Sequence, residues 1–139
     1  LEKVQKRATK MVHGCRNMSY IDRLKLLNLP TLKYRRMRGD MIDAFKIINE
    51  IYDAAVLPVL TRNFDSRTRG NSFKLRVNRC TYDLRKYSFC NRIISVWNSL
   101  DDYVVTSPSV NSFKNNLDKF WNAEDFKFDH KAHLSSSLF

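Results

Sequence analysis

Lysine and arginine are the residues of this chain whose number and spacing indicate chemistry, and that chemistry is the binding of a polyanion. The chain has 25 lysines and arginines against 14 acidic residues, a formal net charge of +11. Within residues 1–12, four cations recur at helical intervals of three and four and would form one row on a helix. These four residues are Lys3, Lys6, Arg7 and Lys10.

A second group of cations lies at the start of a helix that we expect from residue 32 to about residue 52. The group consists of Lys33, Arg35, Arg36 and Arg38. Positive charges near a helix N-terminus oppose the helix dipole, so four of them together favour an external anion. Arg36 and Asp40 are four residues apart, so one member of the group has a possible partner within the same helix.

Arginine dominates a third basic segment, residues 61–99, and arginine suits bidentate contacts to phosphate. The candidate contacts here are Arg67, Arg69, Arg79, Arg85 and Arg92. Tyr82, Tyr87 and Phe89 are interleaved with these cations and either stack on unpaired bases or pack in the core, and helical spacing favours the core. Nucleic acid is the usual intracellular polyanion, so we predict contacts with an RNA or DNA backbone. The alternative is that the charges only keep the chain soluble.

The sequence predicts no catalytic residue, no metal site and no cofactor. Asp101 and Asp102 follow a predicted helix and are typical of a turn that ends it, whereas catalytic carboxylates of a two-metal site must converge on the metal ions. His130 and His133 have no third ligand nearby. The glycines are isolated, so we expect neither a phosphate-binding loop nor a small-molecule substrate.

Three unclustered cysteines, Cys15, Cys80 and Cys90, indicate reduced thiols in an intracellular protein, with a Cys80–Cys90 disulfide as the alternative. No apolar run approaches the length of a membrane span, so we expect no membrane partner. The chain opens within a helical pattern and not at methionine, and we interpret it as part of a longer protein.

The fold class we predict is mainly α, with about five helices in two helical hairpins and a small β-hairpin or extended loop between them. A first helix would turn Leu1, Val4, Ala8, Met11 and Val12 inward. Ser19 and Thr31 would cap the next two helices, and a strand at 73–77 would pair with 80–84.

Two further amphipathic helices, at 89–100 and 110–121, would bury Trp97 and Trp121, with a serine cap and Pro108 at the first helical position of the second. Residues 1–122 would form one helical domain, divided into a first group of helices (1–60), a basic loop or β element (61–85) and a helical hairpin (86–122). Residues 123–139 would be a poorly ordered polar tail.

Three blocks of the sequence resemble the C-terminal region of reverse transcriptases from non-LTR retrotransposons (LINE, jockey-like). They read LEKVQKRATKMV at 1–12, LNLPTLKYRRMRGDMIDAFKII at 27–48, and RIISVWNSL with SVNSFKNNLDKFW at 92–121. Asp101 stands where that family usually has proline. The first block is similar to a helix of the polymerase thumb, and the others to the domain that follows it.

The resemblance implies that the parent protein is an RNA-directed DNA polymerase whose catalytic aspartates lie outside this chain. The chain would then hold element RNA, primer–template or target DNA beside an upstream reverse-transcriptase domain. Its location would be the nucleus, a cytoplasmic ribonucleoprotein, or both. Two alternatives stay open. One is a protein-interaction domain that exposes Met37, Met41 and Ile48, and the other is a decayed element without function.

Overall fold

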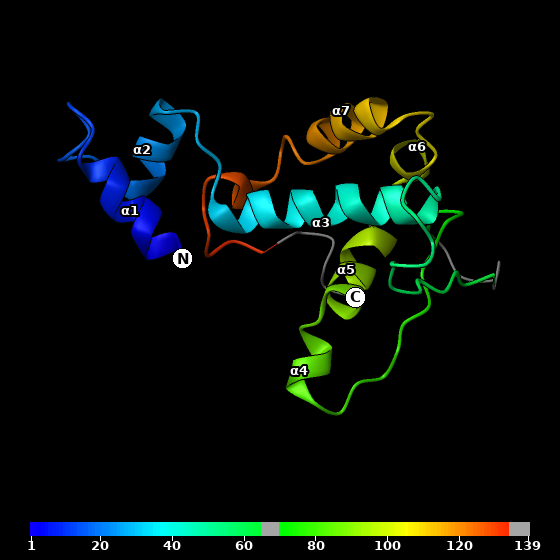
Figure 1. Cartoon of the computed structure of the whole chain (residues 1–139). Coiled ribbons are helices and arrows are strands. Elements are labelled where there is room, and N and C mark those ends of the chain that lie inside the picture. Colours follow the sequence, from blue (N-terminus) through cyan, green and yellow to red (C-terminus); the bar gives the residue numbers. More distant parts are fainter. Residues whose placement is uncertain (65–69, 134–139) are drawn as a thin grey trace.

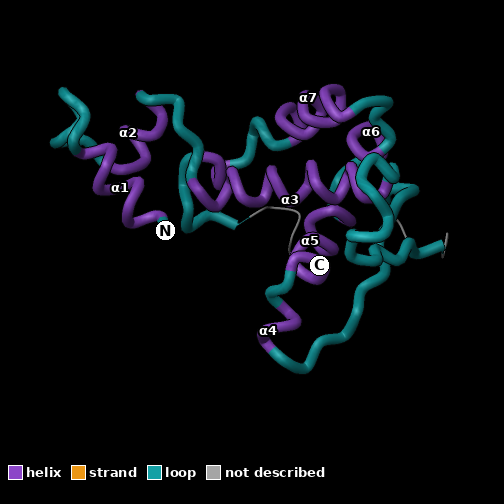
Figure 2. The backbone as a smooth tube through the Cα atoms, viewed as in Figure 1, coloured by secondary structure: helices purple, strands orange, loops and turns teal. Residues whose placement is uncertain are grey.

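The chain folds mainly as α-helix, as predicted. The computed structural model describes residues 1–64 and 70–133, and within them there is no β-strand (Figure 2). The helices are α1 (Glu2–Lys10), α2 (Tyr20–Leu26), α3 (Leu32–Ile48), α4 (Asp83–Lys86), α5 (Phe89–Asn98), α6 (Asp102–Val105) and α7 (Val110–Phe120), followed by the 3-10 turn η1 (Asp125–Lys127).

The long helix α3 is the centre of the fold, and α5 and α7 pack on it (Figure 1). Phe45 of α3 stacks on Phe113 of α7 with ring centroids 4.4 Å apart, and Phe113 stacks in turn on Trp97 of α5 at 5.9 Å. Trp97 and Trp121 are both fully buried, which confirms their predicted packing role. The core therefore lies where these three helices meet.

The apolar residues of α3 that would form an adhesive surface are part of this core. Met41 is fully buried, and Met37 and Ile48 are partly buried against the core cluster. The predicted exposure of these three residues is therefore wrong, because α5 and α7 cover the face of α3 on which they lie.

Side-chain caps begin three helices, two of them at the predicted residues Ser19 and Thr31 and the third at Ser109. The hydroxyls of Ser19, Thr31 and Ser109 accept hydrogen bonds from the backbone N–H three residues ahead, at Asp22, Tyr34 and Ser112. Pro108 precedes the Ser109 cap, so the expectation of proline at the first helical position is wrong.

Helix α3 ends at Ile48, four residues earlier than its apolar period predicts. Glu50 adopts the left-handed conformation, with φ of 55°, and the Ile51 N–H turns back to donate to the Lys46 carbonyl over 2.9 Å. This arrangement provides hydrogen bonds to carbonyls of the last helical turn. The helix therefore ends before residue 52, where the apolar pattern predicts its end.

The predicted pairing of a strand at 73–77 with 80–84 is not found in the structure. Leu75 instead forms one isolated antiparallel bridge with Arg62. The Asn98 side chain accepts from the Leu75 N–H and donates to the Leu75 carbonyl, at 2.8 and 2.9 Å. The Asn98 side chain of α5 therefore supplies the hydrogen bonds that a second strand would otherwise make to Leu75. Residues 83–86 form the helix α4 instead of a strand.

Residues 123–133 also differ from the prediction of a poorly ordered tail. Phe126 is fully buried and its ring lies 5.2 Å from that of Tyr34. The Phe126 carbonyl accepts from the Thr31 hydroxyl, and the Lys127 carbonyl accepts from the Thr31 N–H. This segment therefore packs against the helices as far as Ala132, and residues 134–139 lie outside the described residues.

Helix α1 contacts the rest of the fold with the opposite face from the one we predict. The Glu2 carboxylate accepts from the Tyr20 hydroxyl at 2.7 Å and from the Leu32 N–H at 3.1 Å. Gln5 donates to the Pro30 carbonyl, and the buried Thr9 hydroxyl accepts from the Arg23 side chain. These polar bonds turn Glu2, Gln5 and Thr9 inward, so the apolar stripe that we expect to be buried faces outward. Leu1, Val4, Met11 and Val12 are all exposed.

Candidate nucleic-acid interface

Helix α1 presents the cation row that its spacing predicts. Lys3, Lys6, Arg7 and Lys10 are all exposed. Among the described residues no carboxylate pairs with any of these four side chains. Their charges are therefore available to a polyanion.

The four cations at the start of α3 divide into two pairs with different roles. Arg35 and Arg36 are exposed. Lys33 is half-buried and donates to the Ala132 carbonyl at 2.7 Å, and Arg38 pairs with Asp118. Lys33 and Arg38 therefore tie α3 to residues near the end of the chain, which leaves Arg35 and Arg36 for an external anion.

The possible pairing of Arg36 with Asp40 is wrong, because Asp40 binds Arg92 of α5 instead. Two hydrogen bonds of 2.8 Å join the Arg92 guanidinium to the Asp40 carboxylate. This bidentate geometry holds α5 against α3. Arg92, one of our candidate contacts for a nucleic acid, is therefore engaged in an ion pair within the fold.

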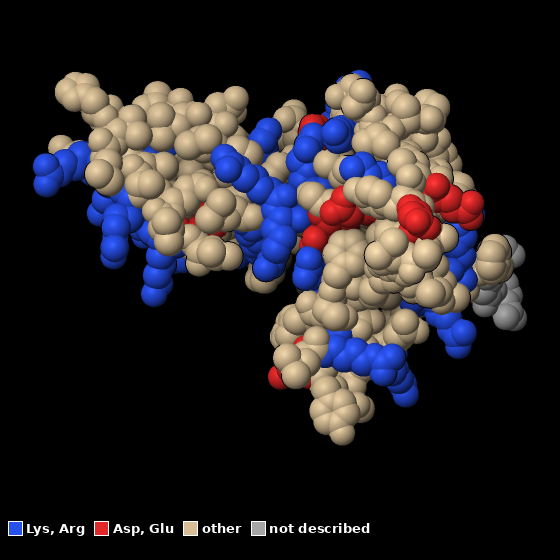
Figure 3. All heavy atoms as spheres, viewed as in Figure 1, with Lys and Arg blue, Asp and Glu red and all other residues tan. Residues whose placement is uncertain are grey.

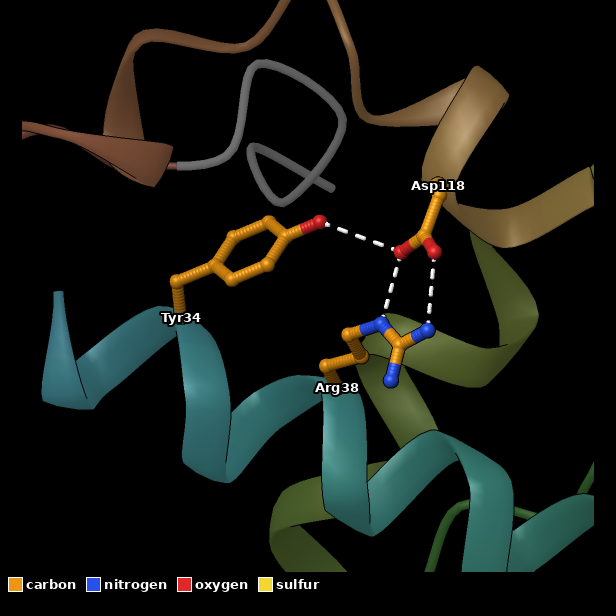
Figure 4. Close-up of polar contacts among 3 residues, drawn as sticks. All are labelled: Tyr34, Arg38 and Asp118. Atoms are coloured by element: carbon orange, nitrogen blue, oxygen red, sulfur yellow. Dashed lines mark hydrogen bonds and ion pairs between the residues drawn. The ribbon is translucent and has the colours of Figure 1, made fainter. Parts of the chain in front are cut away.

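A bidentate ion pair with a tyrosine beside it joins α3 to α7 (Figure 4). Arg38 donates to both oxygens of Asp118, at 2.6 and 2.7 Å, and the Tyr34 hydroxyl lies 3.4 Å from the nearer one. The hydrogen bonds from Arg38 hold the pKa of Asp118 below its usual value. Burial, together with the Asp118 charge, raises the pKa of Tyr34 to about 12. Asp118 is therefore ionised and fully engaged at neutral pH.

This pair forms one wall of a cleft that gathers cations from distant parts of the sequence. The cleft has a volume of about 620 Å³. Its lining residues are Asn28, Pro30, Tyr34, Arg35, Arg38, Asp118, Lys119, Asn122 and Lys127. Among the described residues that line the cleft, the one carboxylate is that of Asp118, which Arg38 neutralises. Arg35, Lys119 and Lys127 therefore give the cleft a net positive charge.

Sequence reasoning misses Lys119 and Lys127, because they lie in a segment whose net charge is slightly negative. The signal available in the sequence is the position of Lys119 on the polar face of α7, beside Asp118. That position alone does not reveal that α3 lies opposite.

The segment around α4 exposes two arginines and two aromatic rings together. Arg79 and Arg85 are exposed, and the exposed fractions of Tyr82 and Tyr87 are 77% and 64%. Phe89 packs against the core, so the core interpretation holds for Phe89 and is wrong for the two tyrosines. An exposed ring beside a cation is a surface on which a base can stack. Arg67 and Arg69 lie outside the described residues.

The cations are spread unevenly over the surface. Figure 3 shows Lys and Arg side chains gathered over α1 and the first half of α3, near α4, and again beside and below the far end of α3. Acidic side chains on the same face gather over the middle and the far end of α3. On this face, positive charge is therefore least offset by acids at the end that carries α1.

The described part of the chain contains neither a cluster of metal ligands nor a membrane-spanning helix. No group of three or more histidine, cysteine, aspartate or glutamate side chains is placed to hold an ion there. Cys15, Cys80 and Cys90 are free thiols. None of the described helices has the length and apolarity that crossing a bilayer requires.

No protein-family model, curated protein or solved structure matches this chain. The chemistry of the surface is therefore the structural feature that bears on function.

The Asp118 ion pair makes stability depend on pH on the acid side. We expect Asp118→Asn to lower the free energy of unfolding by about 1 kcal/mol at pH 7, because the pair is partly exposed. The folded pKa of Asp118 is depressed, so its contribution is complete above the unfolded pKa of about 3.9 and disappears as pH falls through the folded value. Urea unfolding of both proteins between pH 7 and pH 2 measures this difference. A gap that stays constant over that range would contradict the assignment.

Proposed function

We propose that this chain is a non-catalytic nucleic-acid-binding part of an RNA-directed DNA polymerase from a non-LTR retrotransposon. The observation that carries nucleic-acid binding is the cleft in which Arg35, Lys119 and Lys127 meet while Arg38 neutralises Asp118. The identity of the parent protein rests on the resemblance of the three sequence blocks. The partners would be an RNA or DNA backbone and the upstream reverse-transcriptase domain of the same protein, in the nucleus or a cytoplasmic ribonucleoprotein.

The arrangement suits backbone contacts better than the reading of base sequence. Lysine and arginine side chains that bind phosphates fix the position of a nucleic acid without specifying its sequence. The cation row of α1 and the cleft beside α3 supply such contacts from two separate elements. The exposed tyrosines near α4 add stacking for unpaired bases, which favours a structured RNA with single-stranded loops.

Charge reversal in the cleft tests this proposal. We expect Arg35→Glu/Lys119→Glu to weaken binding of a structured RNA. The slope of log K against log salt should become shallower by about 0.7 for each phosphate of a single strand that is no longer bound, and by about 0.9 for each phosphate of a duplex. Filter binding over a salt series measures the slope. Both side chains are exposed, so the fold should persist, and circular dichroism checks that.

A matched control separates the cleft from net charge. Arg76→Glu/Lys131→Glu changes the charge by the same amount at exposed residues that do not line the cleft. We expect this control to keep the wild-type slope. Equal weakening by both double variants would show that only total charge matters. For the parent protein, an upstream coding sequence without a polymerase palm would contradict the retrotransposon assignment.

A further inference from the structure

The apolar face of α1 lines a groove on the surface of the molecule. Val4, Ala8 and Met11 follow one another at helical intervals of four and three, and the exposed fractions of Val4 and Met11 are 69% and 84%. The groove has a volume of about 300 Å³ and is lined by these three residues with Lys3 and Arg7. Helix α1 lies at one end of the molecule, away from α5 and α7 (Figure 1).

Helices at protein surfaces usually bury their apolar stripe and expose their polar face. Helix α1 does the reverse, because Glu2, Gln5 and Thr9 form its inward hydrogen bonds. Those bonds fix the rotation of the helix, so the apolar stripe cannot turn inward without breaking them. A contiguous exposed apolar patch with a charged rim is characteristic of a binding surface.

We propose that this groove binds an amphipathic α-helix of another protein segment, one that carries acidic residues along the edge of its apolar stripe. Ala8 is small and lies between two larger apolar residues, which leaves a hole for one inserted side chain. Lys3 and Arg7 form a positive rim on one side of that hole. The rim selects acidic side chains through charge complementarity.

The same features disfavour two other occupants. A second copy of this chain would bring two positive rims together, which like-charge repulsion opposes. A lipid surface is better served by a longer helix with aromatic anchors, whereas α1 has nine residues and no aromatic side chain. Lys3 and Arg7 belong both to the groove and to the cation row, whereas Lys6 and Lys10 belong to the row alone, so binding of a helix and binding of a nucleic acid can be tested separately.

The test uses the whole chain and two labelled helical peptides with leucine at the a and d heptad positions. One peptide carries glutamate at e and g, and its twin carries lysine there. We expect saturable binding of the glutamate peptide in fluorescence anisotropy, and at least about tenfold weaker binding of the lysine twin. Val4→Asp and Met11→Asp should each weaken the glutamate peptide by about tenfold or more. Both side chains are exposed, so these variants should fold normally.

Control variants separate this groove from the nucleic-acid surface. Lys3→Glu/Arg7→Glu should weaken the glutamate peptide, whereas Lys6→Glu/Lys10→Glu should leave its affinity unchanged and reduce RNA binding. The inference is overturned if the glutamate peptide does not bind, if both peptides bind equally, or if Val4→Asp has no effect. It is also overturned if Val4→Asp abolishes dimerisation in sedimentation experiments or abolishes binding to vesicles of anionic lipid.

Discussion

Replacing Trp97 with alanine is expected to lower the free energy of unfolding by about 3–5 kcal/mol. The Trp97 ring is fully buried and stacks on Phe113. Its indole N–H donates to the Phe73 carbonyl at 2.9 Å, which holds the segment before α4 against the core. Alanine removes the buried area, leaves a cavity between α5 and α7, and deprives that carbonyl of its donor. Urea unfolding followed by far-UV circular dichroism measures the decrease.

Trp97→Phe is the matched control, because it keeps an aromatic ring and removes only the N–H donor and part of the ring volume. We expect a smaller decrease, about 1–3 kcal/mol, from the unpaired Phe73 carbonyl and the small cavity. Tyr82→Ala, at an exposed ring, should change stability by less than about 0.5 kcal/mol. If Trp97→Ala behaved like Tyr82→Ala, α5 would not pack as the structure shows.

The helices around both tryptophans are the part of the fold that the sequence predicts best. Their apolar residues repeat with the helical period over three turns, and Ser109 supplies a local start signal. Each of these signals depends on residues close together in the chain. The contact between Trp97 and Phe113 follows, because two large apolar helix faces remove their surface from water by packing against each other.

The same reasoning fails for α1, although its apolar period is equally regular. Periodicity shows which residues share a face, but tertiary contacts decide which face turns inward. Here the Glu2 carboxylate bonds to Tyr20 and to Leu32, and both partners are far along the chain. No local pattern indicates those bonds, so the sequence identifies the cation row but not the exposure of the apolar stripe.

The sequence predicts that the protein has a basic interface, but it does not predict which residues form that interface. The excess of cations by itself indicates a polyanionic partner. Which cations are free depends on acids that approach from other elements, as when Asp118 neutralises Arg38 and Asp40 neutralises Arg92. The cleft likewise brings together Arg35 and Lys119, which lie in different helices far apart in the chain. Long-range pairing of this kind leaves no periodic signal.

Phe126 gives the second large effect, and it tests whether residues 123–133 belong to the domain. We expect Phe126→Ala to lower the free energy of unfolding by about 3–5 kcal/mol. The ring is fully buried and contacts Tyr34 and Trp121, with centroids 5.2 and 5.5 Å away. Phe126 and Phe128 stand two residues apart in a polar run and give no helical period, which is why the sequence suggests a tail there.

Phe128→Ala is the control for Phe126→Ala, because Phe128 lies two residues away and is only partly buried. Its effect should be clearly smaller, about 1–2 kcal/mol. Phe126→Ala also removes the anchor next to Lys127, so we expect weaker RNA binding under conditions in which the variant is still folded. Equal stability of the wild type and Phe126→Ala would mean that the segment does not pack on α3. The cleft would then lack the wall that brings Lys127 to Arg35, and RNA binding would depend on the cations of α1 together with Arg35 and Lys119.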